Sequence, residues 1–256
     1  LNQYQNWLRV DSVFAPMGVT AQSFSAPAFT DIDSDGDFDL FLGNISDRVE
    51  FFENIGTFDT PLFSKDTSIL SSIYAGGYQF TNSDYPALID LDNDGDFDLV
   101  IGGYNGLIYY ENIGDSTAPV WEKIDTLFTG VNSEIGTDPK PAFADLDDDG
   151  DLDLLVGIGE SLLGGPTAGI TIGFRNVGTP TSPAFQRDNT LTASISDIGL
   201  NSYPTFADLD DDGDYDLLLG RDLASFVYYK NAGTPLVPSW QANYTVFGGV
   251  ENQRYW

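Results

Sequence analysis

One acidic segment of nine residues occurs four times in the chain, beginning at residues 31, 90, 145 and 208. Every copy has aspartate at positions 1, 3, 5, 7 and 9 and glycine at position 6. Two unit charges about 4 Å apart repel by roughly 1 kcal/mol in water and about 4 kcal/mol near a protein surface, so a turn that gathers several carboxylates needs a cation at its centre. Alternating aspartates around a glycine turn provide the hard oxygen ligands that Ca2+ prefers. The sequence therefore predicts a repeat protein that binds about four Ca2+ ions.

The predicted ligands are the side chains at positions 1, 3, 5 and 9 and the backbone carbonyl at position 7. These positions hold Asp31, Asp33, Asp35, Asp37, Asp39, Asp90, Asp92, Asp94, Asp96, Asp98, Asp145, Asp147, Asp149, Asp151, Asp153, Asp208, Asp210, Asp212, Asp214 and Asp216. An EF-hand loop opens in the same way, but it requires a glutamate at position 12 and flanking helices. Position 12 is apolar in all four copies: Leu42, Ile101, Val156 and Leu219. We therefore predict compact calcium turns between strands; the alternative is four solvated acidic turns without metal.

Other features recur in phase with the acidic segments. In the first unit, Pro27-Ala-Phe precedes the segment, and Leu40-Phe-Leu-Gly follows it. Next come an aromatic stretch that ends in Asn54-Ile-Gly and a further aromatic residue, Phe63. Short apolar and aromatic runs bounded by Gly, Asn, Asp and Pro indicate strands, and no helical period is evident. Four strands per unit, repeated along the chain, predict an all-β fold, a β-propeller of four-stranded antiparallel blades with the paired aromatic residues as core between blades.

The predicted units are residues 26–80, 81–135, 136–198 and 199–256, each a blade with one calcium loop. Residues 1–25 are predicted to form the outer strand of an incomplete preceding blade, because the pattern around Trp240 also occurs around Trp7. Both ends of the chain would then supply a fourth strand of a blade, so neither end could complete a blade with the other. We expect that the ring does not close by itself and that the chain is part of a longer or assembled propeller. Its partners would be further blades of a parent chain or other copies of itself.

Composition excludes several classes of function. The 256 residues carry a formal net charge of -30, which disfavours nucleic acid and anionic membranes as partners. No run of about 18 apolar residues is present, so no membrane insertion is expected. The absence of cysteine and histidine removes disulfides, thiol chemistry and the commonest general base. Calcium loops of this kind often bind at about 10⁻⁴–10⁻³ M, the level of extracellular calcium, so we expect a secreted protein, extracellular or at the cell surface.

The acidic segment followed by Leu-apolar-apolar-Gly resembles the calcium-binding repeats of the FG-GAP/VCBS class. Such repeats form the propeller of integrin alpha subunits and occur in many secreted bacterial proteins. The literal Phe-Gly mark is present only at Phe247-Gly248, so the units are most similar to the bacterial VCBS-type variety. The resemblance implies an extracellular propeller, most often seven-bladed, that acts in adhesion, recognition or assembly.

Three functions are compatible with these features. The first is a non-catalytic, calcium-stabilised module for adhesion, recognition or structural assembly, with a protein or carbohydrate as the candidate ligand. The second is the propeller domain of a secreted polysaccharide-active lyase or hydrolase, whose carboxylate pair would come from residues such as Glu134, Asp138 or Glu160. The third is a repeating subunit of an extracellular filament or surface layer. Nothing marks those three acids as special, so we predict that the chain is not an enzyme and has no catalytic residues.

A ligand is expected on the face opposite the acidic loops. That face would be built by the connections at residues 44–48, 103–106, 160–168 and 221–225. Tyr78 and Tyr104 are candidate platforms for a sugar ring, although exposed loop tyrosines are more often plain surface.

Overall fold

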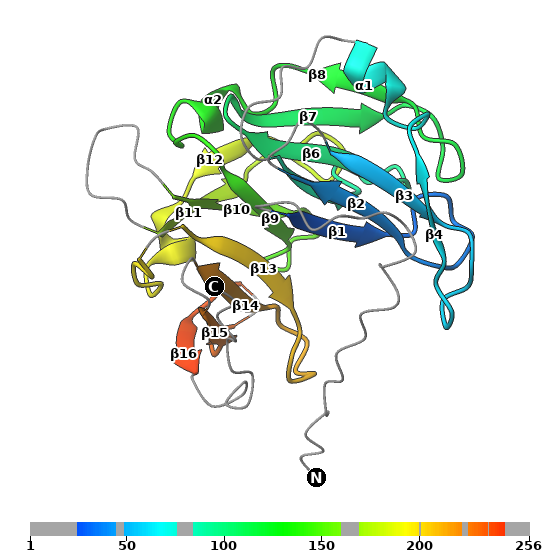
Figure 1. The fold of residues 1–256 in the computed structure, drawn as a ribbon. Coiled ribbons are helices and arrows are strands. Elements are labelled where there is room, and N and C mark those ends of the chain that lie inside the picture. Colours follow the sequence, from blue (N-terminus) through cyan, green and yellow to red (C-terminus); the bar gives the residue numbers. More distant parts are fainter. Residues whose placement is uncertain are drawn as a thin grey trace.

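The chain forms a four-bladed β-propeller (Figure 1). The computed structural model describes residues 25–44, 49–75, 84–159, 169–199, 201–221, 225–234 and 236–243. Each blade is one antiparallel sheet whose four strands pair in chain order. The predicted all-β propeller of four-stranded blades is therefore confirmed. The predicted extra strand around Trp7 lies outside the described residues.

The strands follow the predicted sequence of apolar segments. Blade 1 contains β1 (Ala26–Thr30), β2 (Asp39–Gly43), β3 (Glu50–Asn54) and β4 (Phe63–Asp66). Blade 2 contains β5 (Tyr85–Ile89), β6 (Asp98–Gly103), β7 (Gly106–Asn112) and β8 (Trp121–Ile124). Blade 3 contains β9 (Lys140–Ala144), β10 (Asp153–Ile158), β11 (Ile170–Asn176) and β12 (Phe185–Arg187). Blade 4 contains β13 (Tyr203–Ala207), β14 (Asp216–Arg221), β15 (Ser225–Asn231) and β16 (Trp240–Asn243). Short helices follow β4, β8 and β12, namely α1 (Ser71–Ala75), α2 (Thr129–Asn132) and the 3-10 helix η2 (Asn189–Thr192).

The first strand of each blade is the inner one. Strand β1 lies beside β5, β5 beside β9, and β9 beside β13. Each inner strand has hydrogen bonds to only one neighbour in its sheet, which is why a proline is tolerated at its second residue, as at Pro27 and Pro86. Among the described strands, blades 4 and 1 make no comparable contact. Our expectation that the ring does not close by itself thus stays a prediction.

The glycine at or near the end of the second strand allows the next blade to approach in blades 1 to 3. A Cβ atom on Gly43 would lie 1.7 Å from the carbonyl oxygen of Asp84, and one on Gly102 would lie 1.9 Å from that of Pro139. Such distances are impossible for real atoms, so a side chain at either position would push two blades apart. The apolar run closed by glycine is therefore a signature of blade packing as well as of a strand.

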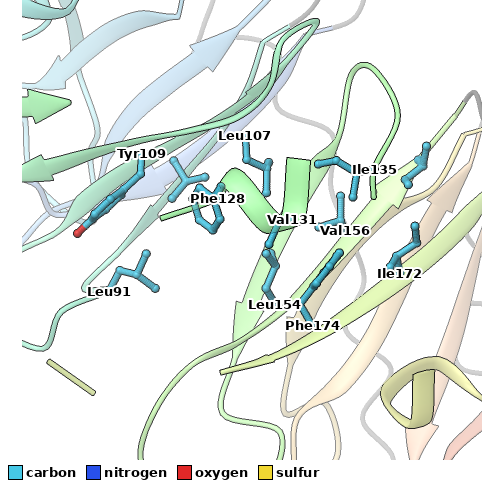
Figure 2. Close-up of a cluster of buried hydrophobic side chains, with 12 residues drawn as sticks. Leu91, Leu107, Tyr109, Phe128, Val131, Ile135, Leu154, Val156, Ile172 and Phe174 are labelled. Atoms are coloured by element: carbon cyan, nitrogen blue, oxygen red, sulfur yellow. The ribbon is translucent and has the colours of Figure 1, made fainter. Parts of the chain in front are cut away.

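The core lies between the blades, and each sheet contributes both faces. In β6, Leu99 and Ile101 pack toward blade 1, whereas Val100 packs toward blade 3. Figure 2 shows the cluster between blades 2 and 3, where Tyr109 and Phe174 approach from opposite sides. Packing between blades, as predicted, is observed for Phe51, Tyr109 and Tyr110. A smaller cluster of Leu40, Leu42, Phe52 and Phe63 covers the other face of blade 1.

Three blades meet at a buried lysine at the start of an inner strand. Lys140, the first residue of β9, is only 5% exposed. Its Nζ atom lies 4.9 Å from the ring centroid of Tyr85 and 5.0 Å from that of Tyr203, the first residues of β5 and β13. The same ammonium donates a 3.0 Å hydrogen bond to Asn201 Oδ1. Cation–π contacts of a desolvated ammonium are worth about 2 kcal/mol each, so this group ties blades 2, 3 and 4 together.

Candidate metal centres

Each acidic loop joins the first strand of a blade to the second, and its backbone turns twice through positive φ. Position 4 has φ near +60° in all four loops, which Asn, Asp and, less readily, Ser tolerate. Position 6 has φ between +90° and +100°, which requires glycine. These turns direct backbone N–H groups inward. In loop 2, the N–H groups of Asp94 and Gly95 donate to the two carboxylate oxygens of Asp90, both at 3.1 Å.

The same backbone bonds hold the position 1 carboxylate in the other three loops. The position 5 carboxylate in turn accepts a hydrogen bond from the N–H of position 7, as from Asp37 to Asp35. The loop backbone therefore fixes two of the predicted ligands before any ion arrives.

Three carboxylates converge in every loop. One oxygen from each of positions 1, 3 and 5 lies within 4.8 Å of the other two. The converging residues are Asp31, Asp33 and Asp35; Asp90, Asp92 and Asp94; Asp145, Asp147 and Asp149; and Asp208, Asp210 and Asp212. These are the groups of three that come together in the described part of the chain, and each could hold a metal ion.

The position 7 side chains add an observation that favours a cation. Asp37, Asp96 and Asp151 are more than nine-tenths buried, and their Oδ1 atoms have no hydrogen-bond partner. A buried, unpartnered carboxylate oxygen is costly unless a positive charge compensates it. An all-oxygen donor set with several carboxylates fits a hard cation such as Ca2+. The residues present therefore fit the predicted ion.

The position 9 aspartates are the most deeply buried acids of the loops, and they join the loop to the third strand. Asp98 Oδ2 accepts hydrogen bonds from Leu91 N at 3.1 Å and from the Tyr109 hydroxyl at 2.7 Å, while Oδ1 accepts from Asn112 N at 2.8 Å. Asp216 in blade 4 has the same three kinds of donor. Asp39 accepts the two backbone bonds, and Asp153 Oδ1 accepts the bond from Asn176 N. Direct ligation of an ion by position 9 stays a prediction.

The asparagine at the end of each third strand extends this network. Asn112 Oδ1 accepts hydrogen bonds from Gly114 N at 3.0 Å and Val120 N at 2.9 Å, which close the turn to the fourth strand. The equivalent bonds occur at Asn54, Asn176 and Asn231. In the sequence, Asn-x-Gly recurs in phase with the ninth aspartate. This recurrence is the signal for the link between the two residues, but the link was not predicted.

Residues 90–156 match the family model described as FG-GAP-like repeat. The matched segment begins at the first aspartate of loop 2 and contains loop 3, so the resemblance to FG-GAP repeats is confirmed there. No curated protein matches the chain. A solved structure of an Agrocybe aegerita lectin, described for its specific recognition of non-reducing terminal N-acetylglucosamine, is similar with a TM-score of 0.48 and 19% identity. The alignment covers 84% of this chain and 51% of the lectin, so the chain spans about half the lectin's length.

Burial perturbs the pKa of several loop carboxyls when no ion is present. It raises the pKa of Asp98 and of Asp153 to about 7, and hydrogen bonds from backbone N–H groups only partly oppose this effect. Burial likewise raises the pKa of Asp39 and of Asp151 to about 6. The calcium-free fold therefore binds protons that the unfolded chain releases.

We expect the calcium-free protein to lose stability as the pH rises from 5 to 8. A carboxyl group whose pKa is higher in the folded state than in the unfolded state stabilises the fold while it is protonated. This contribution is complete below about pH 4, the carboxyl pKa in the unfolded chain, and is lost as the pH rises through the folded-state pKa values of about 6 to 7. A bound ion keeps the carboxylates ionised, so the calcium-loaded protein should change little over this range. Melting curves in EDTA and in calcium at pH 5, 6, 7 and 8 measure both trends. A melting temperature in EDTA that rises with pH over this interval would contradict the raised pKa values of the loop carboxyls in the folded state.

The other predicted residues do not form a comparable site. Glu134 lies in an exposed ion pair with Arg187, with 3.3 Å between Oε2 and Nη1. Glu160, Tyr78 and much of the predicted ligand face lie outside the described residues. Tyr104 is 53% exposed. None of the helices in the described part of the chain has the length and apolar character needed to span a bilayer.

Proposed function

We propose that the chain is a non-catalytic, calcium-binding propeller module in which Ca2+ stabilises the blades. The observation that carries this proposal is the convergence of three carboxylates in all four loops, with a buried fourth carboxylate that has one unpartnered oxygen in loops 1 to 3. A single acidic turn could be a solvated surface feature. Four turns with the same positive-φ geometry and the same inward N–H groups form a repeated ion cradle.

An ion in the loop would act on several strands at once. The loop connects the first and second strands, and its ninth residue is bonded to the end of the third strand. Binding would also compensate the carboxylate repulsion that otherwise opposes the turn. Calcium would therefore contribute to folding itself, because the cradle exists only in the folded chain.

The module is best suited to adhesion, recognition or structural assembly outside the cell. Extracellular calcium at about 10⁻³ M would fill loops of moderate affinity, whereas resting cytosol would leave them empty. Catalysis is not proposed, because the chain has no histidine or cysteine and most of its clustered acids are engaged in the loops. Partners would be further blades of a parent chain, another copy, or a protein or carbohydrate ligand.

We expect close to four calcium ions per chain at saturation. Elemental analysis after equilibrium dialysis in millimolar calcium measures the stoichiometry directly. In the matched variant, Asp90→Asn with Asp92→Asn and Asp94→Asn neutralises the three converging carboxylates of loop 2 and should reduce the count by one. A wild-type stoichiometry of zero or one would refute the proposed function.

A further inference from the structure

The four acidic loops differ in charge at position 4, where loops 3 and 4 have the exposed Asp148 and Asp211, and at one neighbouring position, the residue that precedes the asparagine of each third strand. This position holds Glu53 in blade 1 and Glu111 in blade 2, but Arg175 in blade 3 and Lys230 in blade 4. The strand register places it next to the blade's own loop, because the following asparagine is bonded to the ninth aspartate. Two loops are therefore flanked by an acid and two by a base.

In blades 1 and 2 the flanking acid lines the same open pocket as the aspartate at position 3 of the loop. Glu53 and Asp33 line a cavity of about 500 Å³ between blades 1 and 2. Glu111 and Asp92 line its counterpart of about 510 Å³ between blades 2 and 3. A cation at either loop would meet one more carboxylate and no basic side chain from this position.

In blade 3 the flanking base occupies the loop carboxylates. The Nη1 atom of Arg175 forms an ion pair with Asp147 Oδ2 and lies 3.7 Å from Asp153 Oδ2. The Nε atom donates a 3.0 Å hydrogen bond to Asp188 Oδ2. Asp188 is itself held by the N-terminal turn of η2, where it accepts a 2.8 Å bond from Thr190 N. The guanidinium is thus fixed from outside the loop as well as from within it.

In blade 4 a lysine makes the equivalent contact. The Nζ atom of Lys230 forms an ion pair with Asp210 Oδ2 and lies 3.1 Å from Asp212 Oδ2. These are positions 3 and 5 of the loop, both members of the converging group. The lysine is more exposed than Arg175, and its two ion pairs within the described residues are both with its own loop, so its flexible stem can swing away at less cost.

We propose that the loops form two classes of calcium site, tight in blades 1 and 2 and weak in blades 3 and 4, where Arg175 and Lys230 act as built-in counter-ions that compete for the ligands. This inference rests on the proposed calcium function. A tethered cation already compensates part of the charge that Ca2+ would compensate, and it repels an ion held a few ångströms away. Because Arg175 is fixed by Asp188 and Lys230 is not, loop 3 should be the weakest site of the four. Blades 3 and 4 then keep a compensated loop when calcium is low, whereas blades 1 and 2 depend on the ion.

Calcium titration of the EDTA-stripped protein by isothermal calorimetry tests this inference. The wild-type protein should show two tight and two weak sites, and the Kd of the weak class should exceed that of the tight class by about tenfold or more. Lys230→Glu, which gives blade 4 the acidic flanking residue of blades 1 and 2, should convert one weak site to a tight one. Arg175→Glu should convert the other weak site. Arg175→Gln removes the positive charge without reversing it and should give a smaller shift in the same direction, so it replaces Arg175→Glu if the reversed charge impairs folding. Glu111→Lys should weaken one tight site.

Lys65→Glu is the matched control. This substitution changes the net charge by the same amount as Lys230→Glu, but the ion pair of Lys65 is with Glu50 and not with a loop carboxylate. Four equivalent wild-type sites, or equal effects of Lys230→Glu and Lys65→Glu, would overturn the two-class inference and leave the calcium module intact. An absence of calcium binding in the wild type and in every charge variant would refute the proposed function, and the inference with it.

Discussion

Removal of calcium is expected to lower the melting temperature of the protein by about 10 °C or more. An ion that binds only the folded state at one hundred times its Kd stabilises it by about 2.7 kcal/mol per site, so even two filled sites contribute about 5 kcal/mol. For a chain of this size, 1 kcal/mol corresponds to a shift of about 2–4 °C. Thermal unfolding followed by circular dichroism, in millimolar calcium and in EDTA, measures the difference.

A variant of one loop separates the ion from the general effect of chelation. Asp92→Ala removes one converging carboxylate and should lower the melting temperature in calcium by less than EDTA does. In EDTA the same variant should be close to the wild type, because the lost side chain has no ion to bind. An unchanged wild-type melt in EDTA would show that the loops fold without metal.

Asp98→Ala is expected to destabilise the protein by about 4 kcal/mol or more, with or without calcium. The substitution leaves three donors without their acceptor, Leu91 N, Asn112 N and the Tyr109 hydroxyl, in a region that is almost fully buried. Each buried donor left unsatisfied costs about 1–3 kcal/mol. Urea denaturation in calcium and in EDTA measures the free energy of unfolding in both states.

Two further variants calibrate this result. Tyr109→Phe removes one of the three hydrogen bonds and should cost about 1 kcal/mol. Asp216→Ala removes the same network from blade 4 and should resemble Asp98→Ala. If the effect of Asp98→Ala disappeared in EDTA, the ninth aspartate would act through the ion and not as the anchor of the third strand.

The sequence was sufficient for the strands and for the converging loop residues because both depend on local spacing. The runs after each loop, such as Leu99 to Gly102, form the second strands. Aspartates at positions 1, 3 and 5 of a glycine turn come together through backbone geometry alone. The short helices α1 and α2 were missed, because segments of four or five residues are too short to show a helical period.

Features that depend on the packing of blades could not be predicted. Lys140 lies between Tyr85 and Tyr203, which come from different blades and more than fifty residues away in each direction. The contacts of Arg175 with Asp147 and Asp188 depend on the register of three strands. The sequence pattern does not define that register to within one residue, and a shift of one residue would move the side chain to the other face of the sheet. The close approach of blades at Gly43 likewise follows from tertiary structure, although the recurring glycine signals it.

A crystal structure determined in saturating calcium, with anomalous difference maps, tests the central claim most directly. We expect one anomalous peak inside each of the four loops, with carboxylate oxygens of positions 1, 3 and 5 at about 2.3–2.6 Å from the ion. Loops that keep their fold without any peak at saturating calcium would contradict it.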